Sequence, residues 1–165
     1  MFLFEKCCRL SLVHALYINF VFLFYIKIMA RIIGIDYGLS RVGLAVTDRS
    51  GVVPLPLKTI PSAELIPFLQ DYIGREDVEK IILGFPADVD PNEEIVLAIN
   101  NLHEELTNVF PTMPIIFVDE SYTSKLASSY AYKFLSKKER RDKGVIDMLS
   151  AALILQSYMN THDCK

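Results

Sequence analysis

The stretch RIIGIDYGLSRVGLAVTD, residues 31–48, reads as two apolar β-strands joined by a tight turn. The two runs, Arg31–Tyr37 and Val42–Thr47, are rich in β-branched residues, and the residues between them are typical of a turn. One residue does not fit a purely structural hairpin, because Asp36 stands near the end of the first apolar run. An unpaired buried carboxylate costs on the order of several kcal/mol. Asp36 is therefore expected either to pair with Arg41 in the turn or to bind a cation.

The rest of the chain predicts an alternation of helices and strands. A third extended run at residues 52–60 contains two prolines, which places it at a sheet edge. Ser62 and Asn92 are the expected N-caps of the next two helices. Apolar spacing predicts helices at residues 62–73, 92–109, 123–135 and 144–160, and short buried strands at 78–84 and 113–120. This order, βββαβαβαα, predicts an α/β fold with a mixed sheet covered by helices, in which the fourth and fifth strands are parallel.

Residues 1–28 differ in composition from the rest of the chain. They are apolar from Leu10 to Ile26, which is at the lower edge of the length of a membrane-spanning helix, about 17–25 residues. Basic residues precede the run, as in a signal peptide, but no small-x-small cleavage site comes after it. A third interpretation is that Met29 is the functional start. The expected organisation is a hydrophobic N-terminal extension at 1–28, one domain at 29–160 and a tail at 161–165, in the cytoplasm and without stable membrane association unless 1–28 is retained.

Charge and cysteine content exclude two classes of protein. The net charge is −3, and residues 29–165 alone hold 14 basic and 19 acidic side chains, a net of −5. Bulk positive charge therefore cannot hold a nucleic acid, which would need a local basic patch or metal ions. The three cysteines are Cys7, Cys8 and Cys164, so the middle of the chain has no disulfide framework and no thiolate zinc site. A reducing compartment fits this pattern.

Acidic residues stand in apolar surroundings at three separate places: Asp36, the pair Asp119 and Glu120 that closes the fifth strand, and Asp147 in the final helix. Each has an ordinary explanation, such as the Arg41 pair, a strand-end loop, or a helix N-terminus that favours negative charge. Brought together, they would repel and raise one another's pKa values. A divalent cation removes that repulsion, and Mg²⁺ prefers carboxylate oxygens. The combination therefore indicates a metal site for phosphodiester chemistry.

A basic loop lies directly before Asp147. Its five basic residues are Lys137, Lys138, Arg140, Arg141 and Lys143. Such a loop can hold phosphates beside a metal site, although a solvated loop is the commoner role of a charged run.

Four motifs occur in one order along the chain: IGIDYGLSRVGLAVTD, LGFP, VDESYTS and KGVIDMLSAALILQSY. With this order and spacing, the segment from Arg31 to about Met159 resembles the YqgF/RuvX family, Holliday junction resolvase-like proteins linked to pre-16S ribosomal RNA processing. The resemblance implies an RNase H-like fold, with a mixed five-stranded sheet whose first three strands are antiparallel and with helices on both faces.

The resemblance also implies roles for particular residues. Asp36, Glu120 and Asp147 would be the catalytic acids that bind Mg²⁺ or Mn²⁺, with Asp119 as a further candidate ligand. Arg41 and Lys143 would contact phosphates, as would the other basic residues of the loop. Gly34 and Gly38, on either side of Asp36, would leave room for a phosphate and the ions. Three positions depart from the family pattern: Ser121 stands where arginine is usual, Asp90-Pro91 replaces Asp-Gly, and Leu39-Ser40 replaces Thr-Lys.

The function implied is that of a metal-dependent nuclease that processes the 5′ end of pre-16S rRNA in ribosome biogenesis. Its partners would be precursor rRNA and ribosome assembly intermediates. Two alternatives share the fold, a Holliday junction resolvase acting on branched DNA and a non-catalytic RNA-binding assembly factor. An ATP-binding domain of the actin type, which the GIDYG sequence also resembles, needs two lobes and a much longer chain.

Overall fold

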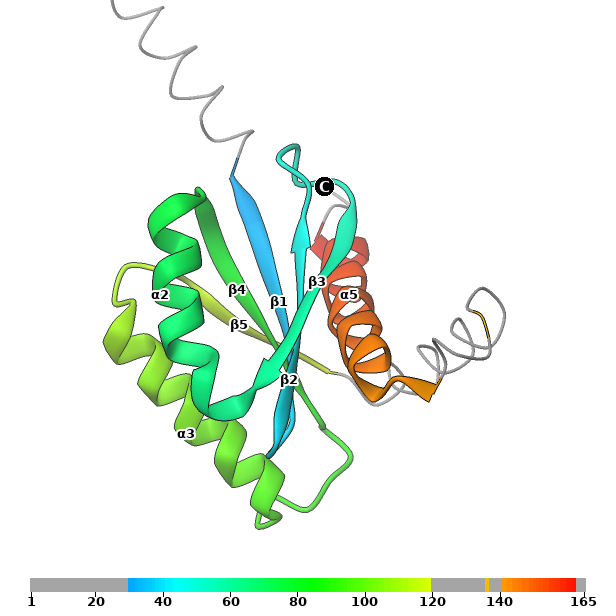
Figure 1. Ribbon diagram of the computed structural model, residues 1–165. Helices are drawn as coiled ribbons and strands as arrows, with labels where there is room; N and C mark the ends of the chain where they lie inside the picture. The colour runs from blue at the N-terminus through cyan, green and yellow to red at the C-terminus, as the bar shows by residue number, and fades with distance from the viewer. Residues whose placement is uncertain (1–29, 120–135, 137–140, 163–165) are drawn as a thin grey trace, which may run out of the picture.

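The computed structural model describes residues 30–119, 136 and 141–162. The elements are β1 (Arg31–Tyr37), β2 (Arg41–Thr47), β3 (Pro54–Pro61), a 3-10 turn η1 (Ser62–Glu64), α2 (Leu65–Arg75), β4 (Val78–Phe85), α3 (Glu94–Val109), β5 (Ile115–Asp119) and α5 (Lys143–His162). Figure 1 shows these elements around one twisted sheet. The helix predicted at 123–135 and the apolar segment 1–28 lie outside the described residues.

The five strands form one sheet in the order β3-β2-β1-β4-β5. β1 and β2 are antiparallel, as are β2 and β3, whereas β4 runs parallel to both β1 and β5. This confirms the mixed sheet with an antiparallel first half. It also places β1, which carries Asp36, in the centre of the sheet.

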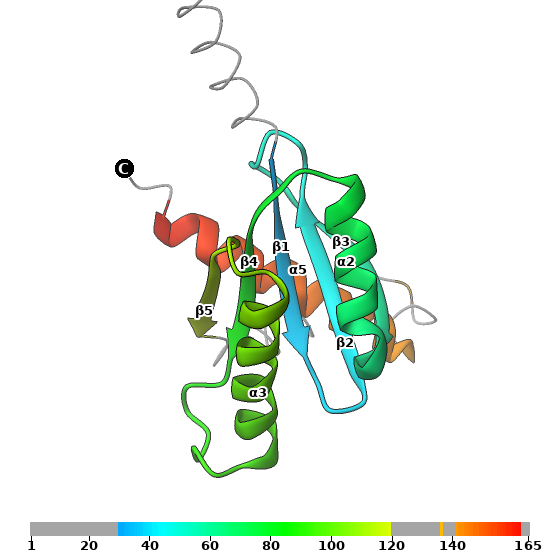
Figure 2. The same ribbon diagram turned by 90° about the vertical axis from the view of Figure 1, so that its left-hand side faces the viewer.

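Helices α2 and α3 cover one face of the sheet, and α5 covers the other (Figures 1 and 2). Alternate residues of a strand point to opposite faces, so neighbours in sequence belong to different cores. Ile33, Ile35 and Leu44 pack with Leu69 of α2 and Ile99 of α3. The other face packs on α5, and its buried residues are Ile32, Ala45, Ile82, Ala151, Ile154, Leu155, Tyr158 and Met159.

Both predicted helix caps are wrong. Ser62 begins a 3-10 turn, and its hydroxyl donates to the carbonyl oxygen of Gly38 at 2.6 Å, so it ties this turn to the β1–β2 loop. Asn92 donates its backbone N–H to Oδ1 of Asp90 at 2.8 Å, and α3 begins two residues later without a side-chain cap. In each case the side chain that was expected to cap a helix donates to another acceptor, Ser62 to Gly38 and Asn92 Nδ2 to Asp90 Oδ1 at 3.1 Å.

Within the described part of the chain, no helix is both long enough and apolar enough to cross a membrane.

Candidate active site

The candidate site lies where the first turns of α5 cross the sheet. Asp36 of β1, Gly43 of β2 and Thr59 of β3 stand directly opposite one another in neighbouring strands. We call these three residues the cross-strand row. Each meets α5 by a different contact, and the Thr59 hydroxyl donates to the carbonyl oxygen of Gly144 at 2.6 Å. The residues of this row therefore hold the start of α5 against the antiparallel half of the sheet.

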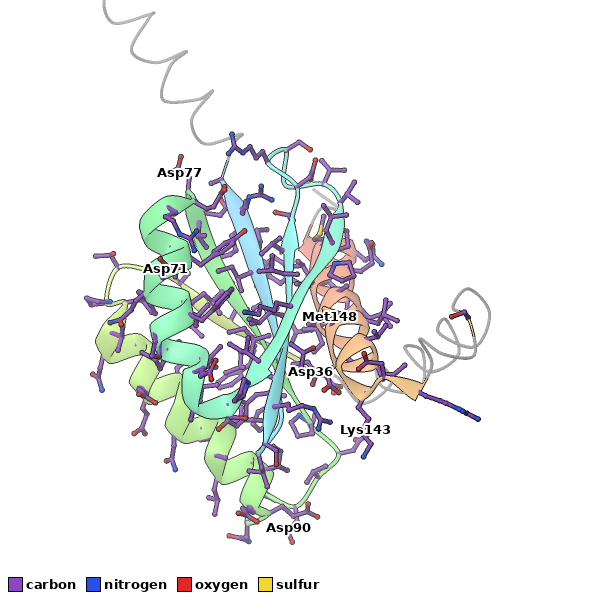
Figure 3. All side chains as sticks on the ribbon, in the orientation of Figure 1. Asp36, Asp71, Asp77, Asp90, Lys143 and Met148 are labelled. Atoms are coloured by element: carbon purple, nitrogen blue, oxygen red, sulfur yellow. The ribbon has the colours of Figure 1, made fainter. Side chains whose placement is uncertain are left out.

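Asp36 is a half-buried carboxyl group between sheet and helix (Figure 3). Burial is the main cause that raises its pKa, to about 6 from an ordinary 3.8, and the negative charge of Asp147 raises it further. A hydrogen bond from the side chain of Ser150 acts in the opposite direction and lowers the pKa. A strongly raised carboxyl pKa with a specific charged neighbour is typical of functional sites.

Asp147, on the first turns of α5, is held by Arg41 from the start of β2. Arg41 Nε lies 3.0 Å from Asp147 Oδ2, and the two side chains are 46% and 26% exposed. Arg41 therefore pairs with Asp147, and not with Asp36 as one interpretation of the hairpin sequence had it. The structure brings Asp147 to Arg41, 106 positions earlier in the sequence, and to Asp36 in the neighbouring strand.

Two glycines, Gly34 of β1 and Gly43 of β2, allow the backbone of α5 to lie close against the sheet. A Cβ atom at Gly43 would overlap the backbone carbonyl of Asp147 and lie 3.0 Å from the nitrogen of Met148. A Cβ atom at Gly34 would lie 2.9 Å from the carbonyl oxygen of Ala151. The expectation that Gly34 leaves room for a phosphate is therefore wrong, because the helix backbone fills that space.

The other predicted acids are distributed differently. Asp119 is paired with Phe85 in the β4–β5 ladder, and Phe85 packs in the core under α2 and α3. Since paired residues of parallel strands share a face, Asp119 lies on the side of the sheet opposite Asp36. Glu120 lies outside the described residues, as do Ser121, Lys137, Lys138 and Arg140.

Two of the predicted basic residues line one groove with a third that the sequence did not suggest. This groove, of about 520 Å³, runs between β3 and the start of α5, and Arg41, Lys58, Thr59 and Lys143 are among its lining residues. Figure 3 shows Lys143 at the beginning of α5. Arg141, two residues earlier, is exposed. The groove thus includes Arg41, the partner of Asp147, and its lining carries three basic side chains and one acidic one, Asp142.

Sequence reasoning missed Gly43, Ser150 and Lys58. A signal existed for Ser150, because a residue three positions after Asp147 lies on the same helix face. Gly43 and Lys58 gave no such local signal, since their importance depends on where α5 crosses the sheet.

The residues present suit a hard divalent cation. Asp36, Asp147 and Ser150 offer only oxygen atoms, which is the donor type that Mg²⁺ and Mn²⁺ prefer. A cation would also offset the two effects that raise the pKa of Asp36, its burial and its repulsion by Asp147, because it stabilises the ionised carboxylate. Across residues 30–119, 136 and 141–162, no group of three or more His, Cys, Asp and Glu side chains is placed to hold a metal. Two carboxylates are therefore the part of the proposed metal site that the structure describes.

Comparisons with known proteins show the family to which the chain belongs. The family model described as "RuvX: Holliday junction resolvase" matches residues 30–161. A protein from Porphyromonas gingivalis named "Putative pre-16S rRNA nuclease" is 42% identical over 137 residues, which is 82% of this chain and 99% of that protein. One of the same name from Amoebophilus asiaticus is 44% identical over 136 residues, 81% of this chain and 96% of that protein.

Two solved structures share the fold. T. thermophilus RuvC in complex with a Holliday junction substrate superimposes with a TM-score of 0.51 at 17% identity, over 81% of this chain and 96% of that one. Fowlpox virus resolvase in complex with Holliday junction DNA gives a TM-score of 0.51 at 12% identity, over 79% and 97%. The RNase H-like fold expected from the sequence is thereby confirmed.

Proposed function

This chain belongs to the RuvX family and is a phosphodiester-cleaving nuclease, and from this premise we propose that it cleaves precursor 16S rRNA at its 5′ end in a reaction that depends on Mg²⁺ or Mn²⁺. The name shared by the two bacterial relatives supports the choice of RNA. A precursor-rRNA substrate would place the protein in the cytoplasm, with ribosome assembly intermediates as partners. The nuclease domain in this proposal comprises residues 29–160.

The observation that carries the proposal is that the carboxyl group of Asp36 on β1 lies near that of Asp147 on α5, close enough for the charge of Asp147 to raise the pKa of Asp36. We assign both carboxylates, together with Glu120, to hold the metal. A bound divalent ion supplies Lewis-acid stabilisation of the charge that develops on phosphodiester oxygens. Asp36 must be ionised to bind it, and a pKa of about 6 leaves it mostly ionised at neutral pH.

The groove beside the acid pair is the proposed path of the nucleic acid backbone. Arg41, Lys58 and Lys143 line it, and phosphate contacts of this kind set the register of a nucleic acid without reading its sequence. Arg41 connects the groove to the acid pair, because it lines the groove and also forms an ion pair with Asp147. The basic residues Lys137, Lys138, Arg140 and Arg141 are proposed to extend the same contact surface.

A cleavage assay on precursor 16S rRNA, with Mg²⁺, Mn²⁺ or EDTA, tests this function. Asp36→Asn, Glu120→Gln and Asp147→Asn should each abolish metal-dependent cleavage, since each removes a negative charge from the metal site. Asp71→Asn is the matched control, because Asp71 is an exposed acid on α2, away from Asp36 in Figure 3. If all three variants cut at the wild-type rate, the site assignment is wrong.

A second candidate substrate is a four-way DNA junction, which the family description and the two fold neighbours favour. It uses the same acids, so the same variants serve, and the ratio of cleavage rates on the two substrates decides between them. If neither substrate is cut but RNA is bound in a salt-dependent manner, the protein is a non-catalytic assembly factor.

A further inference from the structure

Gly43 stands at the centre of the cross-strand row. It is directly opposite Asp36 in the β1–β2 ladder, and its Cα hydrogens face the α5 segment that carries Asp147. It is buried and lies within a strand, where glycine is unfavourable because it contributes no side chain to pack. A glycine in that position often marks a close backbone approach, and here the approaching backbone is that of Asp147.

The contact at Gly43 is one that cannot relax locally. A Cβ atom there would overlap the carbonyl carbon and oxygen of Asp147 and lie 3.0 Å from the nitrogen of Met148. These are atoms of the helix backbone, so no side-chain rotamer change can remove the overlap. Any larger residue would have to move the whole first part of α5 away from β2.

We propose that Gly43 is a positioning residue that sets the separation between Asp36 and Asp147 and thereby the affinity of the acid pair for a divalent cation. The inference rests on the proposed function of that pair. Asp36 is fixed in β1 and Asp147 in α5, and Gly43 determines how near the helix comes to the sheet between them. Since Mg²⁺ holds its oxygens at about 2.0–2.1 Å in near-ideal octahedral geometry, a small outward shift of α5 removes one ligand from reach.

A series of glycine-to-alanine variants tests the proposal with Mn²⁺ alone as the probe. Gly43→Ala should lower Mn²⁺ affinity at least 10-fold, measured by isothermal titration calorimetry at neutral pH. Gly34→Ala is the matched control, because its Cβ also meets α5, but at Ala151 and Leu155, farther along the helix from Asp147. Gly74→Ala is the benign control, since nothing lies within 4 Å of a Cβ there. Gly74→Ala should stay within about 3-fold of wild type, and Gly34→Ala should lose less affinity than Gly43→Ala.

A rescue variant separates positioning from general destabilisation. Asp147→Glu alone should weaken Mn²⁺ binding, because the longer side chain overshoots the native gap. In the Gly43→Ala background the same change should restore affinity at least 3-fold, because the extra methylene spans the widened gap. Loss of stability alone predicts no such reversal, so additive effects of the two substitutions would overturn the proposal.

The remaining outcomes are also decisive. If wild type binds no Mn²⁺, the proposed metal site fails, whereas unchanged binding by Gly43→Ala beside a functional wild type rejects only the positioning role. Should Gly43→Ala be unfolded in buffer, the titration is repeated in trimethylamine N-oxide, which favours the compact state. A variant that does not fold even there would show that α5 cannot move outward, and Gly43 would then be a folding residue and not a positioning one.

Discussion

The side chain of Ser150 on α5 hydrogen-bonds the carboxyl group of Asp36 on β1. Ser150 is only 3% exposed and Asp36 is half-buried, so the contact lies at the boundary between the sheet and the helix. It is the one cause that opposes burial and the charge of Asp147, both of which raise the pKa of Asp36. The ionised form of Asp36, which a cation needs, therefore depends on a hydroxyl group supplied by another element.

Replacing Ser150 by alanine should raise the pKa of Asp36 above its value of about 6, because the bond that lowers it is lost. The pKa can be followed by NMR from the carboxyl carbon of Asp36 in metal-free protein. We expect the pH at which half of the protein binds Mg²⁺ to rise in parallel. Ser157→Ala, on the same helix but two turns farther along, is the matched control. An unchanged Asp36 pKa in Ser150→Ala would contradict the role given to Ser150.

Asp36→Asn should stabilise the metal-free protein at high pH. The folded-state pKa of about 6 exceeds the unfolded value near 3.8, so protonation favours the folded state. The contribution of Asp36 to wild-type stability is therefore highest below about pH 4, falls as pH rises towards about 6, and stays low above it. Because each pKa unit is worth about 1.4 kcal/mol, the loss amounts to about 2–3 kcal/mol. Asparagine cannot ionise and should avoid much of it.

Urea unfolding in EDTA between pH 4 and pH 8 measures this difference. The curves of free energy of unfolding against pH for wild type and Asp36→Asn should separate through this range. The exposed Asp71→Asn control should run parallel to wild type. Parallel curves for Asp36→Asn as well would mean that Asp36 is not strained in the metal-free state.

Divalent ions should raise the melting temperature of the wild type in a pH-dependent way. A ligand that binds only the folded state stabilises by about 2.7 kcal/mol at 100 times its dissociation constant. Below about pH 6 protons compete for Asp36, so the Mg²⁺-induced rise in melting temperature should shrink. Asp36→Asn and Asp147→Asn should both lose the rise. A rise that persists in both variants would place the metal elsewhere.

Arg41→Ala should reduce nucleic acid binding with little effect on stability. Its ion pair with Asp147 is half-exposed, and such pairs contribute about 0–1 kcal/mol to folding. Losing one phosphate contact should lower affinity for RNA and reduce the slope of log affinity against log salt by about 1. Arg49→Ala is the control, since Arg49 is an exposed arginine that pairs with Glu76 and is not among the groove-lining residues. Equal salt slopes for Arg41→Ala and wild type would exclude a phosphate contact at Arg41.

The features that could be predicted from the sequence are those that depend on a local pattern of residues. The strands at 31–37 and 78–84, and the final helix, follow apolar periodicities that belong to each segment alone, so they were predicted within about a residue or two. Asp36 and Asp147 were singled out for the same reason, as acids in apolar runs. The roles of Ser62 and Asn92 were not. Ser62 bonds to Gly38, an acceptor that only the fold brings near, and Asn92 bonds to Asp90 in a local turn that competes with helix capping.

The sequence by itself predicted the family and the order of the elements that the structure describes, and it singled out Asp36 and Asp147 as candidate site residues, because these depend on patterns along the chain. The tertiary structure alone decided that Arg41 pairs with Asp147, that Asp119 lies on the other face of the sheet, and that α5 fills the space beside Gly34. The Asp119 placement depends on the pairing of β5 with β4, and the other two depend on where α5 crosses the strands of the sheet. That crossing is set by backbone contact at Gly43 and by the Thr59 hydrogen bond to Gly144. Contacts between residues 85 and 106 positions apart have no local pattern from which they could be predicted.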